Sequence, residues 1–177
     1  MILSRRDERH RENLVLDLVE WIGRKERVSA VDEWRPVMTF RAATLDDCSQ
    51  LAELNHQLIR DEGHRNPMTV PELERRMRNW ISGEYRAIIY EDDGEIVGYA
   101  LFREQAQEVY LRQLFVVRHR RCQGLGRRAV EMLRSQVWPK TKRLTVDVLV
   151  SNKRAINFWR AVGYSEYALS LEIMPAK

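Results

Sequence analysis

The residues best suited to chemistry lie at a turn between a strand and a helix near the middle of the chain. An apolar strand ends at Val117, and the segment 121–126 (RCQGLG) then places two glycines at the start of a helix. Glycine lets a ligand approach the backbone closely, and the unpaired N–H groups of a first helical turn favour an anion. The turn therefore predicts a pyrophosphate site. The alternative is a structural turn beneath a solvated cluster of arginines.

The charge of the chain is concentrated around this turn. The whole chain of 177 residues carries a formal net charge of +4 and has a pI of about 9.3. The segment 118–128 alone contains five arginines and no acid, so it carries +5. A localised cationic patch indicates a localised anionic partner, and arginine is well suited to phosphate. His119 lies in the same segment, and we expect it to be exposed rather than catalytic.

A second motif follows a β-branched run over 144–150. It consists of Asn152, Ala155, the aromatic pair Phe158-Trp159, and the pair Gly163-Tyr164. Together with Arg121, Gly124 and Gly126, which match the pattern R/Q-x-x-G-x-G/A after a strand, this motif resembles those of the GNAT N-acetyltransferase superfamily. The resemblance spans about residues 37–177, with the elements in the expected order.

The resemblance implies an α/β (α+β) fold with a mixed, strongly twisted central sheet of six to seven strands and helices on both faces. The two central strands, 109–117 and 144–150, would splay apart and receive the pantetheine arm of acetyl-CoA, the implied co-substrate. A primary amine of the acceptor, which would be a small molecule or a protein, would attack the acetyl group directly. The implied cofactor-binding residues are Leu114, Phe115, Val116, Arg121, Cys122, Gln123, Gly124, Leu125, Gly126, Arg127, Asn152 and Trp159.

The sequence departs from the family pattern at the groups expected to move protons. Trp159 stands where many members have a tyrosine that protonates the leaving sulfur, and an indole N–H cannot replace it. Tyr164 or Tyr167 could substitute, unless both are packing aromatics. Some members have a glutamate that acts as the general base where this chain has Arg112. Glu108, or Glu104, could act instead through water, although glutamates at a strand edge are more often simply solvated.

Arg112 itself suggests a substrate-binding role. Residues of like parity in a strand share a face, so we expect Arg112 on the side of Leu114 and Val116. An arginine there could bind a carboxylate of the acceptor with two parallel hydrogen bonds. The alternative is an ion pair with Asp147 on the neighbouring strand.

The elements that must position these residues follow from periodicity and turn signals. We expect a GNAT domain over 36–177, preceded by an N-terminal helical extension over 1–35 of unclear role. The Asp93-Gly94 pair predicts a hairpin. The expected helices cover 44–60, 69–81, 124–137 and 152–163, and the expected strands cover 37–41, 85–90, 95–102, 109–117, 144–150 and 168–174.

Composition narrows the remaining function classes. No apolar run approaches the ~20 residues that cross a bilayer, so we expect no membrane partner. Cys48 and Cys122 lack zinc or disulfide spacing, which predicts no metal and suits the cytoplasm. A homodimer is a further expectation. One alternative function is an acyl-CoA-binding regulatory module without turnover. Another is nucleic-acid binding through the arginines, which we do not expect because no aromatic residues are interleaved with them.

Overall fold

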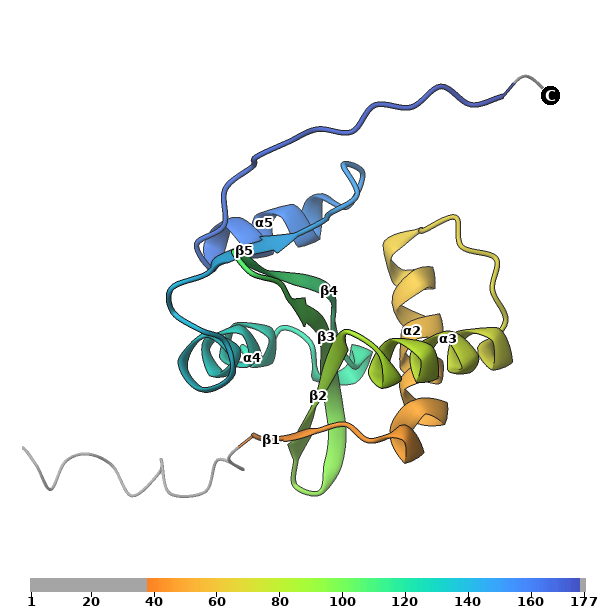
Figure 1. Cartoon of the computed structure of the whole chain (residues 1–177), viewed down its shortest axis with the longest axis vertical. Coiled ribbons are helices and arrows are strands. Elements are labelled where there is room, and N and C mark those ends of the chain that lie inside the picture. The colour runs from red at the N-terminus through yellow and green to blue at the C-terminus, as the bar shows by residue number, and fades with distance from the viewer. Residues whose placement is uncertain (1–37, 176–177) are drawn as a thin grey trace, which may run out of the picture. The chain divides into compact units, whose positions relative to one another are not determined.

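The computed structural model of the chain describes residues 38–175, and these form one mixed sheet with helices around it (Figure 1). The N-terminal extension predicted over 1–35 lies outside the described residues. The sheet has five strands in chain order: β1 (Thr39–Ala42), β2 (Tyr85–Asp92), β3 (Glu95–Glu104), β4 (Glu108–Val116) and β5 (Arg143–Val146). Neighbouring strands are antiparallel except β4 and β5, which run parallel.

The expected strand over 168–174 is absent, so the sheet has five strands rather than the six to seven expected. The segment alternates apolar residues as a strand would, but Leu169, Leu171 and Ile173 are 66%, 87% and 98% exposed. A strand needs the edge of a neighbour to satisfy its backbone, and no described residue provides one for this segment. Alternation alone therefore does not place it in the sheet.

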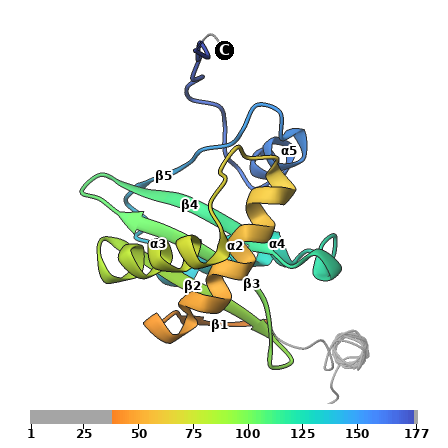
Figure 2. The same cartoon turned by 90° about the vertical axis from the view of Figure 1, so that its right-hand side faces the viewer.

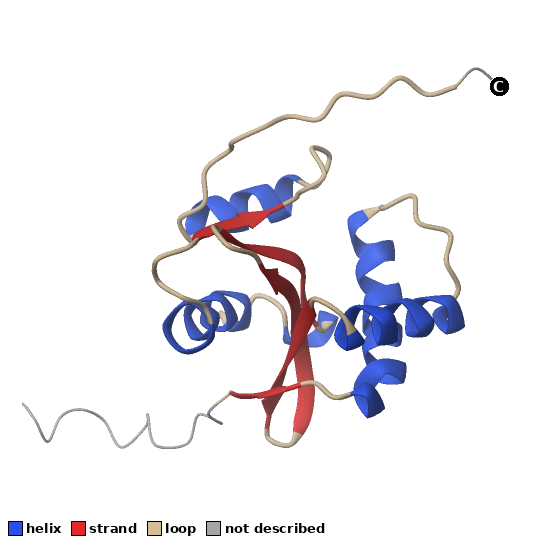
Figure 3. Ribbon diagram, in the orientation of Figure 1, coloured by secondary structure: helices blue, strands red, loops and turns tan. Residues whose placement is uncertain are grey.

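Helices cover both faces of the sheet, as the sequence predicts. Figures 1 and 2 place α2 (Cys48–Glu62) and α3 (Val70–Ser82) on one face and α4 (Leu125–Met132) on the other. Helix α4 continues as a single π-helical segment, η3 (Leu133–Val137), and α5 (Lys153–Ala161) follows β5 in the chain. Figure 3 shows the helices around the strands of the sheet. Because both faces are covered, β3 is buried on both parities from Val97 to Phe102.

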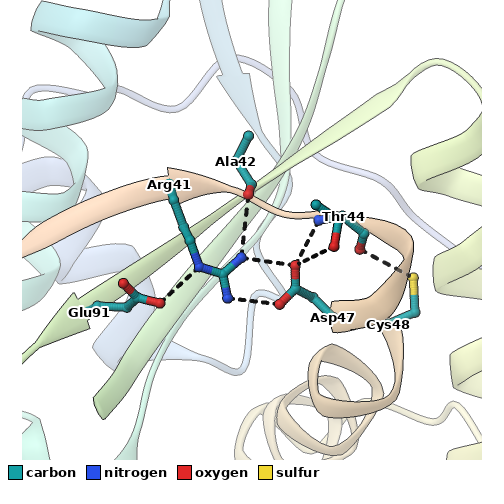
Figure 4. Close-up of polar contacts among 6 residues, drawn as sticks. All are labelled: Arg41, Ala42, Thr44, Asp47, Cys48 and Glu91. Carbon is teal, nitrogen blue, oxygen red and sulfur yellow. Dashed lines mark hydrogen bonds and ion pairs between the residues drawn. The ribbon is translucent and has the colours of Figure 1, made fainter. Parts of the chain in front are cut away.

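An ion-pair network fixes where α2 begins (Figure 4). The guanidinium of Arg41 in β1 donates to both carboxylate oxygens of Asp47, at 2.8 and 2.9 Å, and to Glu91 in β2 at 2.9 Å. Asp47 also accepts the backbone N–H of Thr44 at 2.7 Å, completing the capping box over the short helix η1 (Leu45–Asp47). The network ties two strands to the start of the helix.

The hairpin predicted at Asp93-Gly94 is present. These two residues join β2 to β3 with φ angles of 54° and 77°. Positive φ at both central residues is what a two-residue type I′ turn requires, and its twist matches that of the flanking strands. Helix α3 likewise begins as predicted, at a capping box formed by Thr69 and Glu72. Within residues 38–175, no helix combines the length and apolar character needed to cross a bilayer.

Candidate functional site

The two central strands separate as expected, and a pocket fills the gap between them. Strands β4 and β5 pair only where Glu108–Leu111 lies beside Arg143–Val146. Beyond that point β4 continues to Val116, whereas β5 ends. A pocket of about 490 Å³ opens there, with 112–116 on one wall and 146–148 on the other. An extended ligand arm could therefore lie along the unpaired part of β4.

The turn before α4 closes one end of this pocket with unusual backbone geometry. Cys122 and Gly124 have φ angles of 63° and 80°, so both adopt the left-handed conformation. The first hydrogen bond of the helix runs from the N–H of Arg128 to the carbonyl of Gly124 at 3.1 Å. The amides of 125–127 thus precede the helical ladder and remain available to an anion. A positive φ at a residue other than glycine is uncommon and marks this loop as specialised.

Gly126 is needed for a close contact between α4 and α5. A Cβ at this position would lie 3.2 Å from Cε2 of Phe158, so the aromatic ring would have to move. The contact packs the second motif against the first.

Most of the predicted site residues come together around the pocket. Those that line it are Arg112, Leu114, Phe115, Val116, Arg121, Cys122, Gly124, Leu125, Gly126, Arg127, Asn152 and Trp159. Gln123, Glu108 and Tyr164 do not line it. Gln123 lies in the turn and donates to the carbonyl of His119 at 3.3 Å. The roles assigned to all these residues stay predictions.

The arginines of the segment 118–128 are less available to an external anion than the composition of the segment indicates. Arg118 and Arg121 both pair with Asp61 at the end of α2, and Arg120 pairs with Asp92 at the end of β2. These acids lie 26 or more positions before the segment 118–128, so the charge count over that segment could not include them. Arg121 also donates to the carbonyl of Val116 at 2.8 Å, which holds the turn against β4. Three of the five arginines therefore have carboxylate partners within the protein.

Asn152 has a structural role in addition to the predicted one. Its side-chain oxygen accepts the N–H of Ala155 at 3.0 Å, so it is the N-cap of α5. This cap orients the amide, whose nitrogen remains as a donor toward the pocket that Asn152 lines.

Tyr164 lies behind Trp159 rather than on the pocket wall. The two rings meet edge to face with centroids 5.1 Å apart, and Trp159 alone lines the pocket. The Tyr164 hydroxyl is buried without a hydrogen-bond partner among the described residues. Burial raises its pKa to about 12, which makes it a weaker acid than an ordinary tyrosine.

Glu108 and Glu104 lie at the opposite end of the β4–β5 pair from the turn. Glu108 pairs with Arg143 at 2.5 Å, and Glu104 pairs with Lys142 at 2.8 Å. Each carboxylate thus has a local cationic partner at the strand edge, and neither lines the pocket.

A β-bulge changes the face on which Arg112 lies. Leu111 pairs with Phe102 and Gln113 pairs with Leu101, so Arg112 is the extra residue between them. Its guanidinium carbon lies 4.6 Å from the centre of the Trp80 ring on α3. The expectation that Arg112 shares a face with Leu114 and Val116 is therefore wrong, because the bulge interrupts the alternation.

The alternative partner of Arg112 is occupied elsewhere. Asp147 accepts a hydrogen bond from the hydroxyl of Tyr110 at 2.8 Å. No ion pair between Asp147 and Arg112 forms in the part of the chain that the structure describes.

A carboxylate that the sequence reasoning missed faces the gap. Glu62, the last residue of α2, lines the pocket opposite β4. Burial, and then the neighbouring charge of Asp61, raise the pKa of Glu62 above its ordinary value. A raised carboxylate pKa inside a pocket is typical of a group that exchanges protons. The only sequence signal was its place just before the glycine that ends α2, which does not reveal the strand it faces.

Comparisons with known proteins agree with this geometry. The family model described as the acetyltransferase (GNAT) family matches residues 51–164. A search of curated proteins finds no match. Among residues 38–175, no group of three or more His, Cys, Asp or Glu side chains is arranged to hold a metal ion.

Several solved structures share the fold. A mutant of the BH1408 protein from Bacillus halodurans is 23% identical, with a TM-score of 0.67 over 78% of this chain and 100% of that chain. The aminoglycoside N-acetyltransferase AAC(6')-Iy in complex with CoA is 15% identical, with a TM-score of 0.64 over 79% and 95%. A predicted acetyltransferase with acetyl-CoA from Clostridium acetobutylicum is 16% identical, with a TM-score of 0.62 over 78% and 96%. The chain belongs to the GNAT acetyltransferase family.

Proposed function

We propose that the protein is an N-acetyltransferase that moves an acetyl group from acetyl-CoA to a primary amine. The observation that carries the proposal is the continuous pocket from the left-handed turn at 122–124 to Glu62. The turn offers backbone donors and arginines to a diphosphate, and Glu62, which lines the same pocket, is a carboxylate suited to accept a proton. One pocket thus combines groups that can hold a nucleotide with a group that can take part in the reaction.

The chain offers matched partners along the length of an acyl-CoA molecule. The amides of 122–127, together with Arg127, would hold the diphosphate. The main chain of 114–116, which pairs with β3 but not with β5, and the amide nitrogen of Asn152 would hold the pantetheine arm. The AAC(6')-Iy structure contains CoA, which supports acyl-CoA use by a protein of this fold.

The protein must supply a group that removes a proton from the amine of the acceptor. When bound, acetyl-CoA supplies an activated acetyl thioester. An amine of pKa ~10.4 is almost wholly protonated near neutral pH, so a base must take its proton. We assign this task to Glu62, because it lines the pocket whereas Glu108 is held by Arg143 at the strand edge.

Protonation of the leaving sulfur is less demanding. A thiol of pKa ~8.5 departs tolerably as the thiolate near neutral pH. Tyr164 is the remaining candidate donor, although it lies behind Trp159 and off the pocket wall; Tyr164→Phe, which removes only its hydroxyl, tests this role. A fall in kcat of about 100-fold or more would support this role. An unchanged kcat would assign the proton to solvent.

The assay is release of free thiol from acetyl-CoA across amino acids, polyamines, aminoglycosides and peptide N-termini. The proposal expects turnover with at least one class of amine. The second candidate is an acyl-CoA-binding module without turnover, which is favoured by Trp159 on the pocket wall where many relatives have tyrosine. Binding of acetyl-CoA with no thiol release across the panel would establish that alternative. Cytoplasmic location and a homodimer stay predictions.

A further inference from the structure

Two arginines, of which Arg112 lines the pocket, stack on one aromatic ring. The guanidinium carbon of Arg76 lies 4.5 Å from the centre of the Trp80 ring, and that of Arg112 lies 4.6 Å from it. Arg112 lies 5.8 Å from the ring of Tyr85, which packs against Trp80 with centroids 5.7 Å apart. Helix α3 and the bulge in β4 thus bring two positive charges to one aromatic cluster.

Neither guanidinium has a carboxylate partner within residues 38–175, whereas Arg103, Arg121 and Arg143 each have one. Nearby Arg103, for example, pairs with Glu84 at 2.9 Å. The Nε of Arg76 is buried with no hydrogen-bond acceptor in the described part of the chain. Burial, and then the nearby charge of Arg112, lower the pKa of Arg76. An anion that binds both guanidinium groups would offset the repulsion between these like charges.

Arg112 connects the pair to the pocket. Arg112, its neighbour Gln113 and Glu62 all line it. Gln113 is fixed by hydrogen bonds to Asn55 at 2.8 Å and to the hydroxyl of Tyr99 at 3.0 Å. A ligand held at Arg112 would therefore lie in the same space as the carboxylate proposed to deprotonate the amine.

The stacking leaves the arginines able to bind a planar anion. A guanidinium that uses its face against an aromatic ring keeps its in-plane N–H groups free. Those groups match a carboxylate in a bidentate geometry, and a charge-assisted hydrogen bond of this kind is among the stronger ones. A polycationic acceptor would meet two like charges here.

We propose that Arg76 and Arg112, stacked on Trp80, bind the carboxylate of the acceptor, so that the acceptor is an amino acid or a similar small molecule with both an amine and a carboxylate. This proposal specifies the acceptor of the proposed acetyl transfer. Only the statement that the acceptor carries an amine rests on the proposed function. Anion binding itself can be measured without any acetyl transfer.

The test compares ligands that differ only in the carboxylate. Titration calorimetry on the full chain, in the presence of CoA, would use L-phenylalanine against phenethylamine and L-lysine against cadaverine. We expect each amino acid to bind at least tenfold more tightly than its decarboxylated partner. Inorganic phosphate serves as a further probe, and tighter binding of phosphate than of acetate would overturn the carboxylate assignment in favour of a phosphorylated acceptor.

Matched variants locate the effect. Arg76→Gln and Arg112→Gln should each remove most of the preference for the amino acid, while leaving CoA affinity within about twofold. Arg112→Lys keeps the charge but loses the planar fork, so it should retain only part of the preference. Arg75→Gln, an exposed neighbour on α3 with the same change in charge, is the control and should bind as the parent does. Preference that survives both Gln variants would overturn the proposal.

The outcomes separate this proposal from the broader one. Carboxylate binding that depends on Arg76 and Arg112, without any thiol release, would keep the anion site and remove the acetyltransferase activity. Thiol release with amines regardless of a carboxylate would keep the activity and remove the anion site. A separate titration of each variant with CoA reports whether that variant is folded.

Discussion

The substitution Gly124→Ala tests whether the left-handed turn holds the nucleotide. Gly124 has a φ of 80°, and a Cβ built on it meets no protein atom within 4 Å because it projects into open space at the pocket wall. Gly94, in the hairpin between β2 and β3, has a φ of 77° and equally open surroundings, and it does not line the pocket. The two positions thus match in strain and differ in location.

The expected magnitudes follow from this comparison. An L-residue in the left-handed conformation costs roughly 1–2 kcal/mol. For a chain of this size that corresponds to a fall in Tm of about 2–8 °C, which we expect for both Gly124→Ala and Gly94→Ala. A methyl group that displaces the diphosphate from one amide removes a charge-assisted hydrogen bond of about 1.5–3 kcal/mol. Only Gly124→Ala should therefore bind CoA about 10- to 100-fold more weakly.

Thermal denaturation and titration calorimetry with CoA supply the two readouts. A CoA affinity that is unchanged in both alanine variants would refute the reasoning, because the methyl group of Gly124→Ala would then not disturb the diphosphate. A loss of affinity in both variants would attribute the effect to reduced stability rather than to the turn.

Three further substitutions test other parts of the structure. Glu62→Gln should lower kcat by about 100-fold or more, and should abolish the rise of kcat/KM as the pH increases through the pKa of Glu62; a retained rise would point to another base. Asp47→Asn should destabilise the fold by about 1–2 kcal/mol at neutral pH. Since Arg41 lowers the pKa of Asp47 from 3.8 to about 2, this difference should shrink as the pH falls through that interval in denaturant titrations, and a constant difference would argue against the ion pair. Arg120→Ala should cost about 3–5 kcal/mol because it leaves the buried Asp92 unpaired, and adding Asp92→Ala should recover part of that loss; a double variant as unstable as the single one would contradict this.

Local sequence signals predicted the parts of the fold that local chemistry determines. The hairpin at Asp93-Gly94 and the start of the helix predicted over 69–81 formed as expected, because a turn type and a helix start depend on a few adjacent residues. The turn at 122–126 was found for the same reason. The segment 168–174 shows the limit, since its alternation fits a strand but pairing depends on a partner edge.

Features that depend on distant residues were not predictable in this way. The bulge at Arg112 appears only in the register between β3 and β4, and it moves the side chain to the face of Trp80. The partners of the arginine cluster, including Asp61, come from elements far earlier in the chain. Glu62 reaches the pocket only because α2 packs beside β4. These contacts decide the acceptor side of the site, whereas the nucleotide side follows from contiguous motifs.

A crystal structure of the protein with CoA tests the central claim most directly. We predict diphosphate oxygens within hydrogen-bond distance of main-chain nitrogens in 122–127, and a pantetheine arm lying between 114–116 and 146–148. A diphosphate bound away from this turn, with the gap between β4 and β5 left empty, would contradict the account.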